Sequence, residues 1–104
     1  GFDAVSEAVE LLESIEKVDL VITGEGYVDD SSFEGKVVGG VLALAQETRT
    51  PAIVIAGGWE KTIACPAPIY GLEDEVGREN AYENTKRSIE LVTKNAISNW
   101  EKGR

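Results

Sequence analysis

The chain has 104 residues, a formal net charge of −9, one cysteine and no histidine. This length suffices for one small domain, and the negative charge predicts a surface that repels nucleic acid and anionic membranes. A single cysteine, Cys65, excludes an internal disulfide, and without histidine any chemistry must use carboxylates, hydroxyls, lysine and backbone groups.

The first half of the chain predicts a helix, a strand, a loop and a second helix. Residues 3–15 form an amphipathic pattern whose apolar positions are Val5, Ala8, Val9, Leu12 and Ile15. Residues 18–23 are apolar almost throughout, as is typical of a buried parallel strand, and we expect residues 24–35 to form a loop. Residues 36–49 predict a helix with inward positions Val38, Val41, Leu42 and Ala45, in which Gly39 and Gly40 serve close packing or a close approach to a ligand.

The second half predicts two further strands and one long helix. Residues 52–58 form a second buried strand, and a connection leads to a weak third strand at residues 68–72. We expect a polar loop at residues 71–79 and an amphipathic helix from Arg78 to Trp100, with Gly77 as its N-cap. The predicted buried stripe of that helix comprises Tyr82, Thr85, Ile89, Val92, Ala96, Ile97 and Trp100, with Thr93 at its margin.

This alternation of helices and strands predicts an α/β fold with a parallel sheet of two or three strands and flanking helices. Strands that are apolar on both faces require helices on both faces and neighbours at both edges, so the thin sheet is expected to be part of a wider one. The absence of methionine fits this expectation, because it indicates a chain cut from a longer one or an initiator that was removed.

Both main strands end in glycine, and ligands bind at the carboxyl ends of strands in open parallel sheets. Thr23-Gly24-Glu25-Gly26 follows the first strand and Ala56-Gly57-Gly58 follows the second. Glycine lets a ligand approach the backbone and exposes N–H groups to an anion. The helix that begins near Gly35-Lys36 adds positive charge from its N-terminus and from the lysine.

Three carboxylates accompany these glycines: Glu25, Asp29 and Asp30. They can hold Mg²⁺ through oxygen, and one can take a proton from a hydroxyl, which suits phosphoryl transfer to a small hydroxy acid. The alternative is purely structural, because glycine-rich turns are common in α/β folds and Ser31 or Ser32 can simply cap a helix. The chain contains neither a Walker A loop nor the GxGxxG dinucleotide pattern, so the residues alone leave both interpretations open.

The stretch DLVITGEGYVDDSSFEGKVVGGVLALA resembles the glycerate kinase family that includes bacterial glycerate 2-kinases. The matching positions are Asp19 to Gly26, Asp29, Ser32, Gly35, Lys36, Gly40, Val41 and Ala45. Residues 51–58 and 81–100 are similar to the second strand and the final helix of the family. Three positions depart from the family pattern, because Tyr27 replaces an arginine, Ser31 a glutamine and Val38 a proline, which points to altered substrate preference or lost activity.

The resemblance implies a cytoplasmic kinase that phosphorylates glycerate with ATP and Mg²⁺. It implies that the chain is a single α/β segment, residues 1–104, that completes a Rossmann-like domain begun by an N-terminal segment, beside a second domain. It assigns phosphate or substrate contacts to Thr23, Gly24, Gly26, Gly35 and Gly57. It assigns metal binding to Glu25 and Asp29, and catalysis to these two carboxylates together with Lys36.

Two other functions remain open at this point. The chain can be a binding or regulatory module that kept the fold and lost the reaction, as the departures at Tyr27 and Ser31 suggest. It can also be an interaction domain whose sheet edges pair with another chain or another copy.

Overall fold

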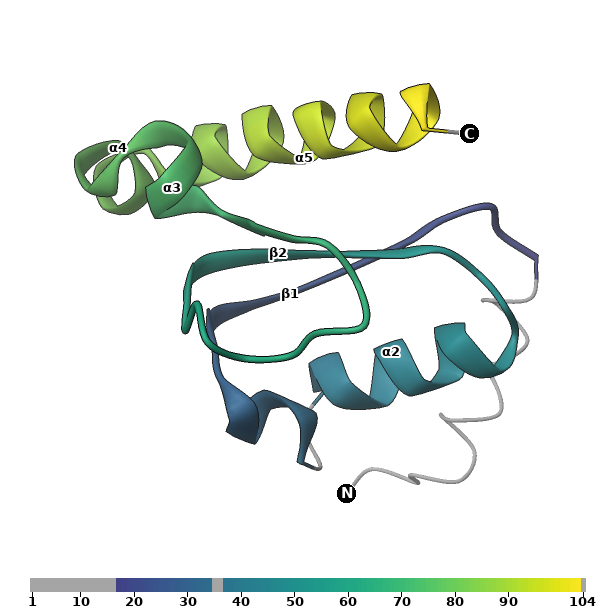
Figure 1. Cartoon of the computed structure of the whole chain (residues 1–104). Helices are drawn as coiled ribbons and strands as arrows, with labels where there is room; N and C mark the ends of the chain where they lie inside the picture. The colour runs from purple at the N-terminus through teal and green to yellow at the C-terminus, as the bar shows by residue number, and fades with distance from the viewer. Residues whose placement is uncertain (1–16, 35–36, 104) are drawn as a thin grey trace, which may run out of the picture.

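A computed structural model describes residues 17–34 and 37–103 of the chain (Figure 1). The predicted helix at residues 3–15 and the site residues Gly35 and Lys36 lie outside the described residues. The described elements are β1 (Val21–Val28), the 3₁₀ helix η1 (Asp30–Phe33), α2 (Val37–Glu47), β2 (Ala52–Trp59), β3 (Ile69–Gly71), α3 (Leu72–Val76), α4 (Arg78–Glu83) and α5 (Thr85–Lys102).

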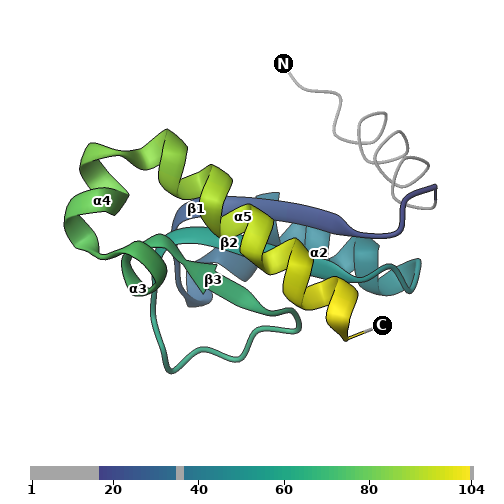
Figure 2. The same cartoon turned by 90° about the horizontal axis from the view of Figure 1, so that it is seen from above.

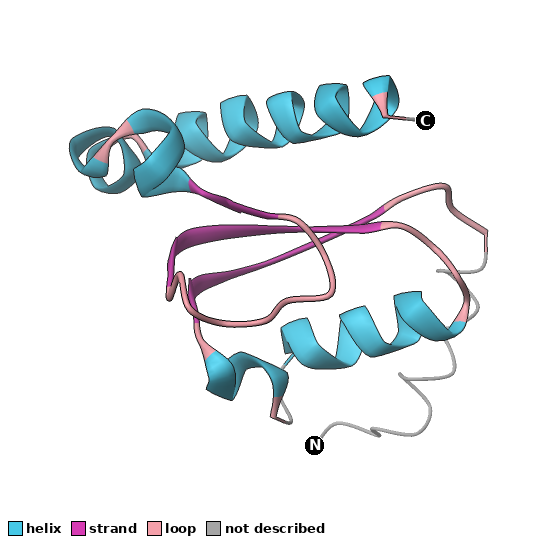
Figure 3. Cartoon of the chain, in the orientation of Figure 1, coloured by secondary structure: helices cyan, strands magenta, loops and turns pink. Residues whose placement is uncertain are grey.

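The three strands form one parallel sheet in the order β1-β2-β3, which confirms the predicted α/β fold and the weak third strand. β1 and β2 pair from Val21 opposite Ala52 to Val28 opposite Trp59. Helices α2 and α5 lie on opposite sides of the sheet (Figure 3). Figure 2 shows α5 running obliquely across the sheet, with β1 at the margin.

Strand β2 supplies the centre of the core because its side chains alternate between two apolar clusters. Ile53 and Ile55 pack with Val92 and Ala96 of α5. Val54 and Ala56 face the other way and pack with α2, mainly through Val38 and Leu42. The continuous apolar run of β2 therefore serves two covered faces, as expected for a parallel strand.

The prediction of a loop at residues 24–35 was wrong for its first part, because β1 continues to Val28. Its glycines sit in the paired strand, where they permit close contact between strands. A Cβ atom on Gly24 would lie 2.6 Å from the carbonyl oxygen of Ile55, and one on Gly57 would lie 2.5 Å from that of Gly26. Gly24 and Gly57, two of the glycines that suggested turns, are thus required for close strand pairing.

The predicted polar loop at residues 71–79 was also wrong, because it contains helix α3. Leu72 is only 4% exposed and joins the core beneath α5, so burial of one apolar residue anchors this acidic segment. Gly77 then ends α3 and caps α4 with φ of 86°, a conformation that favours glycine. The expectation that Gly77 is an N-cap is confirmed.

The predicted long helix is divided at Asn84, whose φ of −125° and ψ of 49° are not helical. The buried stripe of α5 is centred on Ser88, Val92 and Ala96. Tyr82, Thr85 and Ile89, which we expected to be buried, are exposed. The residues that are buried in α4 and α5 are Ala81, Ser88, Val92 and Ala96, of which only the last two were predicted.

Candidate functional site

A groove lies between β1 and the side of α5 that faces the sheet. Its volume is about 390 Å³, and its lining residues are Ile22, Thr23, Gly24, Glu25, Gly26, Ile55, Ala56, Gly57, Leu72, Thr85, Ile89 and Thr93. Five of the predicted site residues are therefore brought together here: Thr23, Gly24, Glu25, Gly26 and Gly57. The prediction that the two glycine-rich segments lie side by side is confirmed by the pairing of β1 with β2.

Strand register explains the shape of this groove. Paired residues of neighbouring strands project to the same face, and Ile22 and Gly24 are opposite Ile53 and Ile55, which pack beneath α5. Ile22 therefore faces the α5 side, and Gly24 leaves bare backbone on that face. The groove therefore has bare backbone at Gly24 and open space at Gly26, where an added Cβ atom would meet no atom within 4 Å.

Thr23 and Glu25 alternate with these positions, and their partners Val54 and Ala56 pack beneath α2. Glu25 is half-buried, and its Oε2 atom is buried. Because β1 lies at the margin of the described sheet, residues of both its faces border the groove. At this edge of the sheet, the TGEG segment therefore exposes the backbone of Gly24 on the α5 face and the side chains of Thr23 and Glu25 on the α2 face.

Helix α5 forms the second wall of the groove through Thr85, Ile89 and Thr93, which are four residues apart and share one helix face. We did not predict these residues as site residues, because the same spacing is typical of a buried stripe. The available signal was the pair of hydroxyl residues in an otherwise apolar stripe. The Thr85 hydroxyl donates to the Ala81 carbonyl oxygen at 2.7 Å.

Asp29 lies just after β1 and caps η1. Its Oδ1 atom accepts hydrogen bonds from the Ser31 N–H at 2.9 Å and from the Ser31 hydroxyl at 2.6 Å. The Asp29 N–H donates to the Ser32 hydroxyl at 3.1 Å, which completes a capping box. A capping role was one interpretation of this turn, but we expected Ser31 or Ser32 to be the cap; the N-cap is Asp29, and Ser32 is its partner at the third position of η1.

The three acidic residues proposed as metal ligands do not form one cluster in the part of the chain that the structure describes. Within residues 17–34 and 37–103, no group of three or more histidine, cysteine, aspartate or glutamate residues is arranged to hold a metal ion. The assignment of Glu25 and Asp29 as metal ligands stays a prediction.

A second polar cluster lies where β2 ends. The Trp59 indole N–H donates to Asp74 Oδ2 at 3.1 Å, and the same carboxylate contacts the Lys61 ammonium, which lies 4.0 Å from the centre of the Trp59 ring. These contacts join the connection after β2 to helix α3. Next to them, a hydrogen bond to Glu73 and the negative charge of that carboxylate raise the pKa of Tyr82 above 10.0.

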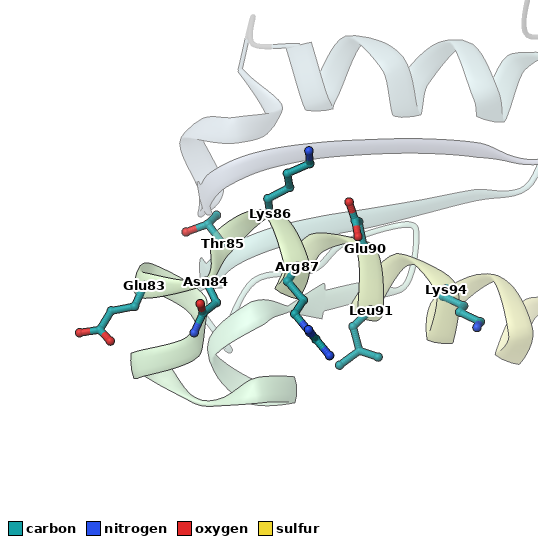
Figure 4. Close-up of a pocket in the computed structure, with 8 residues that line it drawn as sticks. All are labelled: Glu83, Asn84, Thr85, Lys86, Arg87, Glu90, Leu91 and Lys94. Carbon is teal, nitrogen blue, oxygen red and sulfur yellow. The ribbon is translucent and has the colours of Figure 1, made fainter.

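An open depression of about 640 Å³ runs along the end of α4 and the first half of α5, and Figure 4 shows its lining residues. It contains the cations Lys86, Arg87 and Lys94 together with Glu83 and Glu90. Lys86 extends toward the sheet side of α5, whereas Arg87 extends to the opposite side (Figure 4). Thr85 lines both this depression and the groove at β1.

None of the helices in the described ranges is long and apolar enough to cross a membrane.

Comparisons with a family model and with curated proteins both match this chain to glycerate kinases. The sequence model described as the glycerate kinase family matches residues 1–101. The chain is 46% identical over 57 residues to the glycerate 2-kinase of Escherichia coli, which covers 55% of this chain and 15% of that protein. An uncharacterized protein of Synechocystis is 51% identical over the same length and the same shares.

A longer alignment extends over nearly the whole chain. The glycerate kinase of Bacillus cereus is 29% identical over 114 residues, which covers 97% of this chain and 28% of that protein. This chain therefore spans less than a third of the length of the curated relatives that it matches. No solved structure matches. With the family model matched over residues 1–101, the chain belongs to the glycerate kinase family.

Proposed function

We propose that this chain is a C-terminal segment of a cytoplasmic kinase that transfers phosphate from ATP to glycerate, and that the TGEG segment of β1 is part of the active site. The observation that supports this function is the groove that gathers Thr23, Gly24, Glu25, Gly26 and Gly57 beside α5. Family membership supports the choice of glycerate as the acceptor. The remainder of the kinase, an N-terminal segment and a second domain, completes the site. The proposed function requires neither nucleic acid nor a membrane as a partner.

The backbone of β1 has the right direction to bind an anion. The Val21 N–H donates to the Pro51 carbonyl oxygen at 2.9 Å, and N–H groups point alternately to opposite sides of a strand. The N–H groups of Ile22 and Gly24 therefore point away from β2, toward the margin of the described sheet. There the Gly24 N–H can donate to a carboxylate or phosphate oxygen, and the open space at Gly26 lets that anion approach.

The carboxylates of Glu25 and Asp29 have the oxygen donors that Mg²⁺ prefers. The bound Mg²⁺ would neutralise charge on the transferred phosphate. Capping bonds fix the Oδ1 atom of Asp29, so this carboxylate is held in place before substrate binds. In this proposal Lys36 and Gly35 contribute positive charge and an N–H group to the same anion.

Replacement of Asp29 by Asn in the complete kinase polypeptide tests this proposal. Asn is as good an N-cap as Asp, so D29N keeps the fold of η1 while it removes the charge. We expect turnover of glycerate to phosphoglycerate to fall at least about 100-fold, the typical contribution of a positioned acid or base. The control S31A removes the hydrogen bond from the Ser31 hydroxyl to Asp29 Oδ1, keeps the capping bond from the Ser31 N–H and changes no charge, and it should retain turnover.

Two outcomes contradict different parts of this proposal. Unchanged turnover in D29N rules out a catalytic role for Asp29 and leaves only the capping role. Absence of phosphoglycerate from the unmodified polypeptide rules out the kinase activity itself.

A ligand-binding module without turnover is the second candidate, and Tyr27 favours it. Its side chain is 55% exposed beside Gly58, at a position where the family pattern has an arginine. If a cation is needed there, we expect the unmodified polypeptide to bind glycerate without forming product, and Y27R to gain turnover. Calorimetric titration with glycerate and a product assay distinguish this candidate from the kinase.

A further inference from the structure

We propose that the groove between β1 and α5 binds the purine base of the nucleotide donor, with its phosphates directed toward the beginning of α5. This inference rests on the proposed kinase function and names which part of which substrate occupies the groove.

The lining of the groove is complementary to an uncharged, apolar group. Among the described residues, four aliphatic side chains line the groove, and Glu25 is the one ionisable residue that borders it. The aliphatic residues are Ile22, Ile55, Leu72 and Ile89. Glycerate and the phosphates are anionic, so the purine ring is the one part of the proposed substrates that gains from apolar contact. The volume of about 390 Å³ is within the usual range for small-molecule sites.

Two isoleucines on opposite walls flank the opening. Ile22 of β1 is 39% exposed and Ile89 of α5 is 44% exposed, although both border the same groove. Branched side chains that stay this exposed on facing walls leave room for a flat ring between them. The ring would cover them and remove apolar surface from water.

The groove also offers a hydroxyl group for recognition of the ring edge. Thr93 is half-buried in the groove, and within the described part of the chain its hydroxyl makes no hydrogen bond. The Thr85 hydroxyl, in contrast, is already bonded to the Ala81 carbonyl oxygen. Thr93 is therefore the α5 residue that can donate to a ring nitrogen or accept from an amino group.

The position of Lys86 predicts which end of the groove the phosphates of the bound nucleotide occupy. The carboxyl end of β1 and the beginning of α5 lie at the same end of the molecule (Figure 1). At this end Thr85 joins the apolar groove to the depression that contains Lys86, and Lys86 extends toward the sheet (Figure 4). A base near Ile22 and Thr93 would thus place its phosphates near Lys86 and the TGEG segment, where the proposed transfer occurs.

The test uses the complete kinase polypeptide and a matched pair of variants on α5. Ile89 and Leu91 are 44% and 48% exposed, but only Ile89 borders the groove. Leu91 borders the depression on the side of α5 away from the sheet, opposite to Lys86 (Figure 4). We expect I89Q to raise the KM for ATP about tenfold and to leave the KM for glycerate unchanged, because apolar contact with the ring is lost. L91Q should change neither value.

Adenosine and Lys86 separate the base from the phosphates. Adenosine carries no phosphate, so it should inhibit competitively with ATP, and I89Q should weaken this inhibition by the same factor. K86Q should raise the KM for ATP and leave inhibition by adenosine unchanged. T93V should weaken adenosine inhibition, and T93S should restore it.

Several results would overturn the proposal. Equal effects of I89Q and L91Q on the KM for ATP would show that the groove is not the site. A marked fall in Tm for I89Q with unchanged KM for ATP would show that the groove is filled by polypeptide from the rest of the kinase. If the unmodified polypeptide forms no phosphoglycerate, the proposed function fails. Calorimetry then still tests the groove, because adenosine should bind I89Q more weakly than L91Q, and equal affinities would overturn the proposal.

Discussion

The adjacent glycines of α2 should respond in opposite ways to the same substitution. A Cβ atom on Gly40 would meet no atom within 4 Å, whereas one on Gly39 would lie 2.7 Å from the Cα atom of Phe33 in η1. Neither glycine has a positive φ, so alanine fits the helical backbone at both positions. The two substitutions therefore share their effect on helix propensity and differ in the contact between α2 and η1.

The expected free energies follow from these contacts. G40A should stabilise the chain by about 1 kcal/mol, the difference in helix propensity between alanine and glycine. G39A gains the same propensity but forces η1 away from α2, an overpacking that costs about 1–3 kcal/mol. The contacting atom belongs to the backbone of Phe33, so rotation of a side chain cannot relieve it.

Urea denaturation of the full chain, followed by circular dichroism, measures both changes. With a typical slope of about 1–3 kcal/mol per M, the midpoint of G40A should exceed that of G39A by roughly 1 M. Equal midpoints for the two variants would refute the close contact between η1 and α2. A lower midpoint for G40A than for the unmodified chain would refute the open environment of Gly40.

Three further predictions concern capping, a buried hydroxyl and a tyrosine pKa. D29A removes the acceptor that caps η1 and should cost about 1 kcal/mol in urea denaturation, and an unchanged midpoint would exclude the capping role. Ser88 is 3% exposed and donates to the Asn80 carbonyl oxygen at 2.9 Å, so S88A should cost about 1 kcal/mol, with the Tm as the check. Because the pKa of Tyr82 is raised, its contribution to stability is complete below pH 10 and is lost as the pH rises through the folded pKa. Ultraviolet titration should show this pKa return toward its usual value in E73A, which removes both the acceptor and the charge, and persistence of the raised pKa would exclude Glu73 as its cause.

The sequence predicted well the elements whose apolar pattern has a single simple cause. β2 is apolar throughout because both of its faces are covered, and α2 has a single inward stripe. Both were predicted closely. β1 was predicted too short because a glycine pair was taken as a turn, although close strand contact requires glycine equally well.

The division between α4 and α5 was missed for a different reason. No proline or glycine marks it, and the apolar spacing continues across Asn84. Asparagine followed by threonine is a weak signal for a new helix start, because asparagine is a favoured N-cap residue. Thr85 and Ile89 were misplaced for another reason: they share α5 with Val92 and Ala96, but the buried stripe of that helix passes through the polar Ser88 instead. This error hid the α5 wall of the groove.

The part of the candidate site that depends on strand pairing was predicted best. The TGEG and AGG segments lie together because parallel pairing places them in register, and this follows from sequence order. The cap was expected at Ser31 or Ser32 and lies at Asp29, because aspartate is as suited to a helix cap as serine and was assigned to metal binding and catalysis instead.

The position of β1 has a consequence for the behaviour of the chain in solution. In the described ranges no strand flanks β1 on the side away from β2, and Ile22 and Tyr27 are exposed along it. An eight-residue edge with exposed apolar side chains is a template for aggregation into intermolecular sheets. The net charge of −9 opposes that process by repulsion between molecules, and added salt screens this repulsion. The colloidal stability of the chain should therefore decline as ionic strength rises, with β1 as the segment that joins one molecule to the next.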